Sequence, residues 1–258
     1  MTRKMLLAID IGNTNTVLGV FDGERIVHSW RVKTDARNTA DELMLTFTAL
    51  LHGVPVTGIA ACSTVPAAWR ELRTMLARYW PQLPTVLVEP GIKTGVALLF
   101  DNPKEIGADR IVNTLAAFHL IGGPAIVVDF GTSTNFDVVS GRGEFLGGAL
   151  APGIEISLDA LAARAAQLRK VELAVPRSPI GKNTVEALQS GILYGFAGQV
   201  DGLVRRLVAV LAPDQPGSVE VIATGGLAPL VLEHAETVTR HEPELTLIGL
   251  RLVFERNT

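Results

Sequence analysis

Apolar residues in this chain form short β-branched runs that alternate with longer Ala- and Leu-rich stretches. Runs of the first kind are typical of buried strands, and stretches of the second kind are typical of helices. The first three runs are separated only by short turns, one of them Asp22-Gly23, so we predict a three-strand meander there. The strands predicted in this half are Met5–Ile9, Val17–Phe21, Arg25–Arg31, Gly58–Cys62 and Thr85–Val88.

Two helix starts in this half carry capping residues. A Thr followed three positions later by Glu forms a capping box, and Asn before Pro combines an N-cap with a favourable first helical residue. These signals predict helices from Thr39 to about His52 and from Asn102 to about Ile121, the second stopped by Gly122-Gly123-Pro124. A further helix is predicted from about Pro66 to Tyr79.

The second half repeats this alternation, which favours an α/β fold. Its predicted strands are Ala125–Phe130, Asn135–Val139, Glu144–Gly148 and Ser218–Ala223. Its predicted helices are about Ile154–Ala166, Val185–Leu211 with a bend near one of its glycines, and Leu227–Glu236.

Composition restricts the class of protein. The 258 residues are 48% apolar and 19% charged, which is typical of one large or two modest globular domains. With 23 basic and 26 acidic residues the chain lacks a basic footprint, so we expect no nucleic-acid partner. The longest apolar stretch, Leu115–Val128, is interrupted and too short to span a bilayer, so we expect no membrane partner. The single Cys62 excludes a disulfide framework and fits a reducing cytoplasm.

Two loops in the chain resemble each other. Asp10-Ile-Gly-Asn-Thr-Asn-Thr-Val follows one apolar strand and leads into another, and Asp129-Phe-Gly-Thr-Ser-Thr-Asn-Phe does the same 119 residues later. Each is followed by a third strand after a Gly-bearing turn. A repeated unit of this kind indicates two related halves. We therefore predict two domains, residues 1–122 and 123–258, each with its own sheet and helices.

The residues in these loops favour phosphate binding. Glycine lets the backbone approach an anion closely, and the amides of a tight turn form an anion-binding nest. Hydroxyl donors are available at Thr14, Thr16, Thr132 and Ser133. A strand-end Asp such as Asp10 cannot itself hold phosphate, which points to Mg²⁺ bound between them through water. Either loop alone could be an ordinary hairpin, whereas the matched pair favours phosphate chemistry.

Five segments, in this order, carry a family resemblance. They are Asp10-Ile-Gly-Asn-Thr-Asn-Thr16, Gly107-Ala-Asp-Arg110, Asp129-Phe-Gly-Thr132, Gly181-Lys-Asn-Thr184 and Thr224-Gly-Gly226. Together they resemble the type III pantothenate kinases over essentially the whole chain. The resemblance implies an α/β fold of two duplicated ribonuclease-H-like (actin-like ATPase) domains flanking a nucleotide cleft, as in the acetate kinase, sugar kinase, Hsp70 and actin superfamily. It also implies ATP-dependent phosphorylation of pantothenate to 4'-phosphopantothenate, the first step of coenzyme A biosynthesis. The implied enzyme is a homodimer that needs Mg²⁺ and a monovalent cation, K⁺ or NH₄⁺.

The resemblance further implies roles for single residues. Asp109 matches the catalytic base and Asp129 the ligand of the monovalent cation. The residues that match ATP contacts are Asp10, Ile11, Gly12, Asn13, Thr14, Asn15, Thr16, Val17 and Thr132. The residues that match substrate contacts are Phe100, Gly107, Ala108, Asp109, Arg110 and Thr184.

Two positions depart from the family pattern. Phe100 stands where the family often has Tyr, which removes one hydroxyl, and the second loop continues as Ser133-Thr134-Asn135. Thr132 is kept, so ATP binding is expected to survive. These departures keep open an alternative, a catalytically weak or inactive nucleotide-binding or regulatory homologue. A different reaction on the same fold, such as sugar phosphorylation or polyphosphate hydrolysis, is a second alternative.

The substrate segment also has a physical interpretation. On a continuous helix Glu105 and Asp109 would share a face at i,i+4, and in a cleft this pair would raise the pKa of one carboxylate. Arg110 would be free to clamp a substrate carboxylate. From this segment alone, a solvated helix face is an equally good interpretation. Thr224-Gly225-Gly226 could likewise be only a strand-to-helix turn, or could let an adenosine ring lie close to backbone.

The last predicted long helix suggests an assembly. Gly191, Gly195 and Gly198 are spaced by four and three residues, so they could line one stripe to which a second helix packs closely. We predict an obligate homodimer in which Thr184 reaches the partner's pantothenate site. Glycines that only bend a helix packed within its own subunit are the alternative.

Overall fold

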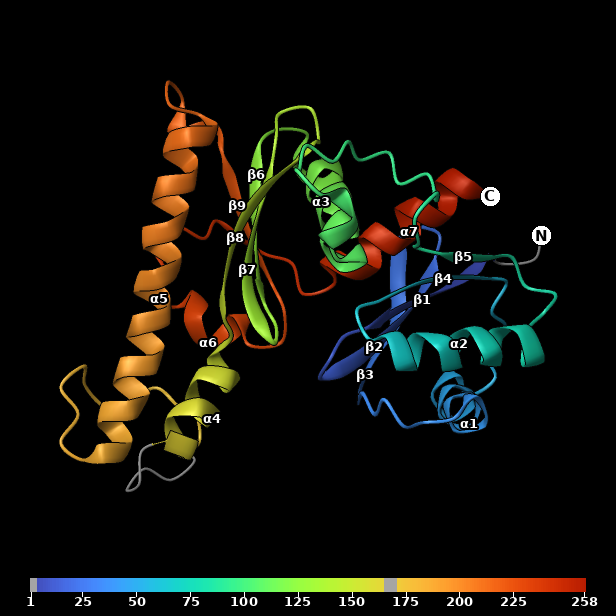
Figure 1. The fold of residues 1–258 in the computed structure, drawn as a ribbon, viewed down its shortest axis with the longest axis horizontal. Helices are drawn as coiled ribbons and strands as arrows, with labels where there is room; N and C mark the ends of the chain where they lie inside the picture. The colour runs from blue at the N-terminus through green and yellow to red at the C-terminus, as the bar shows by residue number, and fades with distance from the viewer. Residues whose placement is uncertain (1–3, 165–170) are drawn as a thin grey trace. The chain divides into compact units, whose positions relative to one another are not determined.

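A computed structural model describes residues 4–164 and 171–258, which form two compact units with one five-stranded sheet each (Figure 1). Unit 1 comprises the described residues up to Val96, together with Asp101–Ala116 and Leu245–Thr258. Unit 2 comprises Ala97–Phe100 and Ala117–Glu244. Strands and helices alternate in both units, so the α/β class predicted from the sequence is confirmed. Among the described residues, no helix is long and apolar enough to cross a membrane.

Unit 1 is built on the sheet β3-β2-β1-β4-β5. Its strands are β1 Met5–Ile11, β2 Asn15–Asp22, β3 Arg25–Lys33, β4 Gly58–Ser63 and β5 Thr85–Leu87. Its helices are α1 Ala40–Leu51, α2 Pro66–Tyr79, the first part of α3 Ala108–Ile121, α7 Leu245–Asn257 and the 3₁₀ turn η1 Pro103–Glu105.

The alternation of side chains along β1 explains why both faces of this sheet are covered. Leu7, Ile9 and Ile11 lie in a cluster with the apolar residues of α1 and α2. Leu6 and Ala8 lie in a second cluster with residues of α3 and α7 on the opposite face. The central strand is therefore buried on both sides, and Asp10 lies on the face of α3 and α7 because it shares the parity of Leu6 and Ala8.

Unit 2 is built on the sheet β10-β9-β6-β7-β8. Its strands are β6 Ala125–Phe130, β7 Ser133–Val139, β8 Phe145–Pro152, β9 Glu220–Thr224 and β10 Arg240–His241. Its helices are α4 Ile154–Arg164, α5 Thr184–Leu211, α6 Ala228–Leu232 and the 3₁₀ turn η2 Pro216–Ser218. Figure 1 shows α5 as one long helix along this sheet. The glycines at which a bend was expected do not interrupt it.

The two sheets have the same topology. In each, the first strand is central, pairs antiparallel with the second strand and pairs parallel with a later one. The third strand extends the antiparallel side and the last strand extends the parallel side. This repeated order confirms the duplication inferred from the two Asp-x-Gly loops.

Several predicted local signals are confirmed. The capping box of α1 is present: the Thr39 hydroxyl accepts from the Glu42 amide, and the Glu42 carboxylate accepts from the Thr39 amide at 2.8 Å. His52 ends this helix with a left-handed backbone at φ 44°. The end of the helix predicted over residues 154–166 lies outside the described residues.

Two predicted helices were wrong in detail, and one helix was not predicted. The helix expected from Asn102 to Ile121 is interrupted, because Ile106 adopts an extended backbone after η1 and α3 begins only at Ala108. The helix predicted over residues 227–236 is shorter, since α6 ends at Leu232. No helix was predicted where α7 lies. Because α7 packs on β1, β4 and β5, the C-terminal residues belong to unit 1. The predicted division at residue 122 had assigned them to the second domain.

Candidate active site

The first loop turns tightly at the end of β1. The amide of Gly12 donates to the carbonyl of Asn15 at 3.0 Å, which closes the turn between β1 and β2. A Cβ on Gly12 would lie 3.2 Å from that carbonyl oxygen, tighter than an ordinary contact. Glycine therefore fits this turn without crowding it, and Asn13 and Thr14 at the loop tip are exposed.

The end of β3 braces the first loop. The amide of Thr34 donates to the carbonyl of Thr14 at 2.9 Å, and the hydroxyls of Thr34 and Thr16 are hydrogen-bonded at 2.9 Å. Thr16 is buried and Ile11 lies in the core, so these two predicted ATP contacts shape the loop from within. Thr14, by contrast, is exposed.

Asp10 lies among groups that disfavour its charge. Burial, followed by the nearby carboxylate of Asp109, raises the pKa of Asp10 to about 7, against the opposing effects of the Cys62 hydrogen bond and of Arg31. The Cys62 thiol donates to Asp10 Oδ1 at 3.3 Å from the neighbouring strand β4. Sequence reasoning treated Cys62 only as a core residue, and no signal in the sequence pairs it with Asp10. Burial also raises the pKa of Cys62, which keeps it a thiol and therefore a donor.

Asp109 stands at the start of α3. Its Oδ1 accepts from the Arg110 amide at 2.9 Å. A Cβ on Gly107 would clash with the same oxygen, so a larger residue there would displace the carboxylate from this position. Burial raises the pKa of Asp109, although the amide and guanidinium of Arg110 oppose the effect. The structure thus brings Asp10 and Asp109 together in unit 1.

The predicted pairing of Glu105 with Asp109 was wrong. Glu105 lies in η1, before the chain turns extended at Ile106, so the two residues do not share a helix face. Instead, Glu105 accepts from the Asn102 side-chain amide at 2.7 Å and is exposed. The carboxylate that interacts electrostatically with Asp109 comes from β1, about 100 residues away in sequence.

The second loop repeats this plan at the end of β6. The Gly131 amide donates to the Ser133 carbonyl at 3.0 Å, and the Ser133 hydroxyl donates to the Asn135 side-chain oxygen at 2.9 Å. Two of the residues that depart from the family pattern are thus bonded to each other. Thr132 is exposed at the loop tip, where its carbonyl accepts from the Gly153 amide at 3.2 Å.

Gly225 explains the Thr-Gly-Gly motif after β9. Its φ is +91°, and a Cβ there would lie 2.6 Å from the Phe130 carbonyl oxygen and 2.7 Å from Asp129 Oδ1. Thr224, paired beside Asp129 in the sheet, is buried. The motif therefore lets backbone approach the second loop closely, and in this structure it is more than a turn between a strand and a helix.

The remaining predicted substrate contacts lie in unit 2. Phe100 packs edge-on against Phe145, with ring centroids 5.9 Å apart, and a Cβ on Gly147 would contact its ring. Thr184 is the exposed first residue of α5, whose N-cap Asn183 accepts from the Glu186 amide at 2.9 Å. Gly107, Ala108, Asp109 and Arg110 belong to unit 1, so the predicted substrate set is divided between the two units.

The donor set fits a cation that is only partly held by protein. Among the described residues, no three His, Cys, Asp or Glu side chains form a metal-binding group. Mg²⁺ in phosphoryl-transfer sites is held by one or two carboxylates, several waters and substrate oxygens. The close carboxylates of Asp10 and Asp109, which repel each other, match this requirement.

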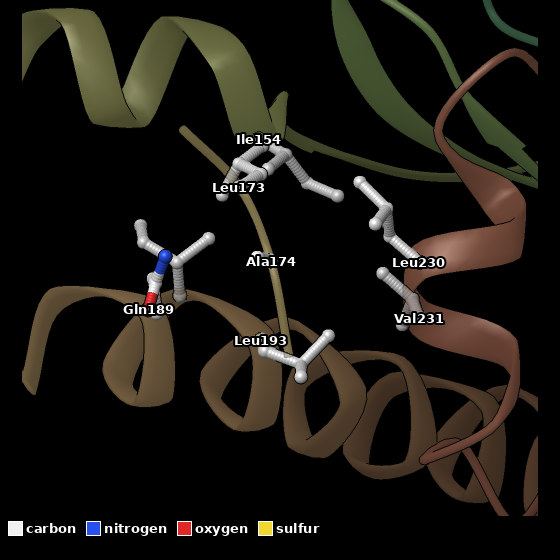
Figure 2. Close-up of a pocket in the computed structure, with 8 residues that line it drawn as sticks. Ile154, Leu173, Ala174, Gln189, Leu193, Leu230 and Val231 are labelled. Carbon is white, nitrogen blue, oxygen red and sulfur yellow. The ribbon is translucent and has the colours of Figure 1, made fainter. Parts of the chain in front are cut away.

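A small apolar cavity in unit 2 does not resemble a ligand site. Figure 2 shows side chains of α4, α5 and α6 around it, and the lining residues are Ile154, Leu173, Ala174, Gln189, Ile192, Leu193, Leu230 and Val231. The one polar side chain, Gln189, donates to the Glu172 carbonyl at 2.9 Å. With no other polar group to orient a ligand, the cavity is a feature of core packing.

Comparisons with known proteins agree with this geometry. A family model described as type III pantothenate kinase matches residues 6–206. Similar curated relatives bearing that name come from Salinispora arenicola, 69% identical over 98% of this chain and 100% of the relative, and Streptomyces avermitilis, 63% identical with 98% of each covered.

Solved structures show the fold at much lower identity. An inorganic polyphosphate/ATP-glucomannokinase from Arthrobacter matches with a TM-score of 0.53 and 14% identity, covering 99% of this chain and 100% of that one. Component A of (R)-2-hydroxyglutaryl-CoA dehydratase from Acidaminococcus fermentans matches with a TM-score of 0.56 and 15% identity, covering 98% and 99%. Both support a duplicated ribonuclease-H-like architecture. The family model matches most of this chain, and the relatives are matched over nearly their full length. The chain therefore belongs to the type III pantothenate kinase family.

Proposed function

We propose that this protein transfers the γ-phosphate of ATP to the primary hydroxyl of pantothenate, the entry step of coenzyme A biosynthesis. The observation that carries the proposal is the Asp10–Asp109 pair in unit 1, in a chain of this family. Phosphoryl transfer to an alcohol needs a base for the hydroxyl proton and screening of the phosphate charge. The pair offers one carboxylate for each task.

Asp109 is the general base in this proposal. Its raised pKa makes the ionised carboxylate a stronger proton acceptor than an exposed Asp. The Arg110 amide holds one carboxylate oxygen, which leaves the other to face the substrate hydroxyl. Arg110 itself is suited to a carboxylate such as that of pantothenate, because a guanidinium binds carboxylates in a bidentate fork.

The first loop holds the nucleotide phosphates. The exposed residues Asn13 and Thr14 give close access to an anion, and the hydrogen bonds from Thr34 hold the loop in this shape. Asp10 would hold Mg²⁺ through water, and the bound ion would screen the phosphate charge.

The second loop has two tasks in this proposal. Asp129 binds a monovalent cation, K⁺ or NH₄⁺, and Thr132 contacts a phosphate of ATP. The close approach of Gly225 supports the first task, since it brings backbone against Asp129 Oδ1 where carbonyl oxygens can complete a cation shell. The exposed position of Thr132 supports the second.

A homodimer completes the proposal. Gly191, Gly195 and Gly198 are exposed on α5, and a Cβ on any of them would meet nothing within 4 Å. An open glycine stripe suits close packing against a second helix, and Thr184 lies at the start of the same helix. We infer that two α5 helices pack together and that Thr184 reaches the partner's substrate. The single buried Cys62 supports a reducing, cytoplasmic setting.

A coupled assay for ADP release tests the reaction. ADP should form with pantothenate as acceptor, and release with hexoses should stay at the level without acceptor. ADP release with hexoses alone would favour the sugar-kinase alternative. Nucleotide binding without release on any acceptor would favour the regulatory alternative, for which Phe100 is the specific observation, because it lacks the hydroxyl common in the family.

Subunit mixing tests the shared site. Asp109→Asn and Thr184→Arg proteins, each inactive alone, are mixed under conditions that exchange subunits. If sites are shared, half of the sites in a mixed dimer carry both lesions and half carry neither, so activity returns. Verified heterodimers that stay inactive would show that each site lies within one chain.

A further inference from the structure

The first loop contains no basic residue. Between Asp10 and Val17 there is no Lys or Arg, unlike loops that place a lysine against the phosphates. The Thr16 hydroxyl is already bonded to Thr34. Given the proposed function, on which this inference rests, any cationic side chain that assists Mg²⁺ in holding a polyphosphate on this loop must come from another element.

The register of the sheet brings such a side chain to the loop. Asp10 pairs with Val17 across β1 and β2, and Val17 pairs with Arg31 across β2 and β3. Directly opposed residues of antiparallel strands point to the same face. Arg31 therefore lies on the same face as Asp10, two strands away, within reach of a long side chain.

Arg31 is available for a ligand. It is exposed, and among the residues that the structure describes no carboxylate oxygen lies within ion-pair distance of its guanidinium. Arg31 also interacts electrostatically with Asp10, which places its positive charge near the end of β1. By contrast, two other side chains of β3 contact each other: His28 stacks on Trp30, with ring centroids 5.4 Å apart.

The position of Arg31 relative to the loop is held by hydrogen bonds. Thr34, three residues further along the chain, bonds Thr14 through backbone and Thr16 through its hydroxyl. The backbone that follows Arg31 is therefore tied directly to the loop on which a ligand would bind.

We propose that Arg31 is a phosphate-binding residue, which supplies to the nucleotide phosphates the positive charge that the first loop lacks. Guanidinium suits this task because it is always charged and presents several donors in a fork that matches phosphate oxygens. The chemistry recognised is the polyphosphate of the nucleotide, not its base or sugar.

The alternative role for Arg31 is protection of a sheet edge. β3 is an edge strand of its sheet, and charged residues on edge strands hinder pairing with other chains. Arg25, at the other end of β3, provides a matched control. It is exposed, lies on the same edge strand and is opposite Asp22 of β2 in the strand register, far from the loop. An edge-protecting role would make the two arginines equivalent.

The test is direct binding of MgADP by calorimetry to the full chain, with Arg31→Gln, Arg31→Lys and Arg25→Gln. We expect Arg31→Gln to weaken MgADP binding about 10- to 100-fold, as for loss of a hydrogen bond to a charged group. Arg31→Lys should keep part of the affinity, and Arg25→Gln should match the wild type. In turnover, the KM for ATP should rise in Arg31→Gln while the KM for pantothenate stays unchanged.

Two results would overturn the assignment. Equal MgADP affinity in Arg31→Gln and Arg25→Gln, both folded by circular dichroism, would exclude a phosphate contact. Equal rises in both KM values would point to a general change in the site. Failure of the proposed function is distinct, because a wild-type protein that binds MgADP but phosphorylates no pantothenate leaves the Arg31 comparison intact.

Discussion

The loops after β1 and β6 share one backbone plan and differ in what lies beside the strand-end aspartate. In each, the amide of the glycine two residues after the aspartate closes the turn, at 3.0 Å in both cases. Beside Asp10 stand the Cys62 thiol and the carboxylate of Asp109. Beside Asp129 stand Thr224 and the close backbone of Gly225.

This difference indicates how the two copies of a duplicated loop can favour different ligands. A second carboxylate near the first makes a place where a proton or a divalent cation is favoured, because like charges at short range must be neutralised. The backbone that Gly225 brings close to Asp129 suits a more weakly charged ion. In the proposed function, the same strand-loop-strand unit therefore serves acid–base chemistry in one half and monovalent-cation binding in the other.

The largest expected effect tests the carboxylate pair. Asp109→Asn keeps the shape of the side chain but removes the proton acceptor, so kcat should fall by about 10²–10⁴-fold. ATP binding should persist, because the first loop is untouched. Steady-state kinetics together with calorimetric nucleotide titration measure both. A variant with near-normal kcat would show that the pair does not supply the base.

The next effect concerns the second loop. Asp129→Ala should remove stimulation by K⁺, so that activity falls to that of the wild type in a buffer of bulky organic cations. The reason is the loss of the only charge that we assign to the monovalent cation. Activity is compared in potassium and tetramethylammonium chloride at equal ionic strength. Full wild-type activity in tetramethylammonium would remove the distinction between the loops.

A stability effect follows from the close approach of Gly225. Gly225→Ala forces a Cβ against the Phe130 carbonyl at a positive φ and should destabilise the protein by about 1–3 kcal/mol. Gly131→Ala, in the same loop, meets only ordinary contacts at 3.7 Å and should change stability by less than about 0.5 kcal/mol. Urea unfolding at equilibrium compares them, and equal losses would mean that the second loop relaxes around either methyl group.

The smallest effect comes from a buried carboxylate outside both loops. Burial alone would raise the pKa of Asp201, but hydrogen bonds from the Thr237 hydroxyl and the amides of Glu236 and Thr237 outweigh it, so the pKa lies below 3.8. A carboxylate with a lowered pKa contributes stability above the unfolded pKa and loses it as the pH falls through the folded pKa.

Asp201→Asn should therefore lower stability at pH 7 by about 1 kcal/mol or more, since one amide loses its acceptor. The deficit relative to wild type should shrink as the pH falls below 3.8. Urea denaturation at pH 7 and pH 3.5 measures this. A deficit that grows on acidification would place Asp201 with Asp10, whose pKa is raised, instead of among satisfied structural carboxylates.

The sequence by itself determined much of this protein. Alternating apolar runs predicted every strand of the two sheets except the short β10, because a strand buried on both faces needs β-branched residues throughout. The Thr39–Glu42 capping box predicted the start of α1, because both hydrogen bonds are local. The repeated Asp-x-Gly loops predicted the duplication, and the five family segments predicted the family.

Only the tertiary structure decided which groups meet. Asp109 was expected to pair with Glu105, four residues earlier, yet an extended Ile106 separates them and the chain fold brings Asp10 instead. α7 packs on unit 1 because the sheet face with Leu6 and Ala8 needs an apolar cover, a demand invisible from the α7 sequence alone. Strand register, set by long-range pairing, likewise placed the Cys62 thiol beside Asp10 and Arg31 two strands away on the same face.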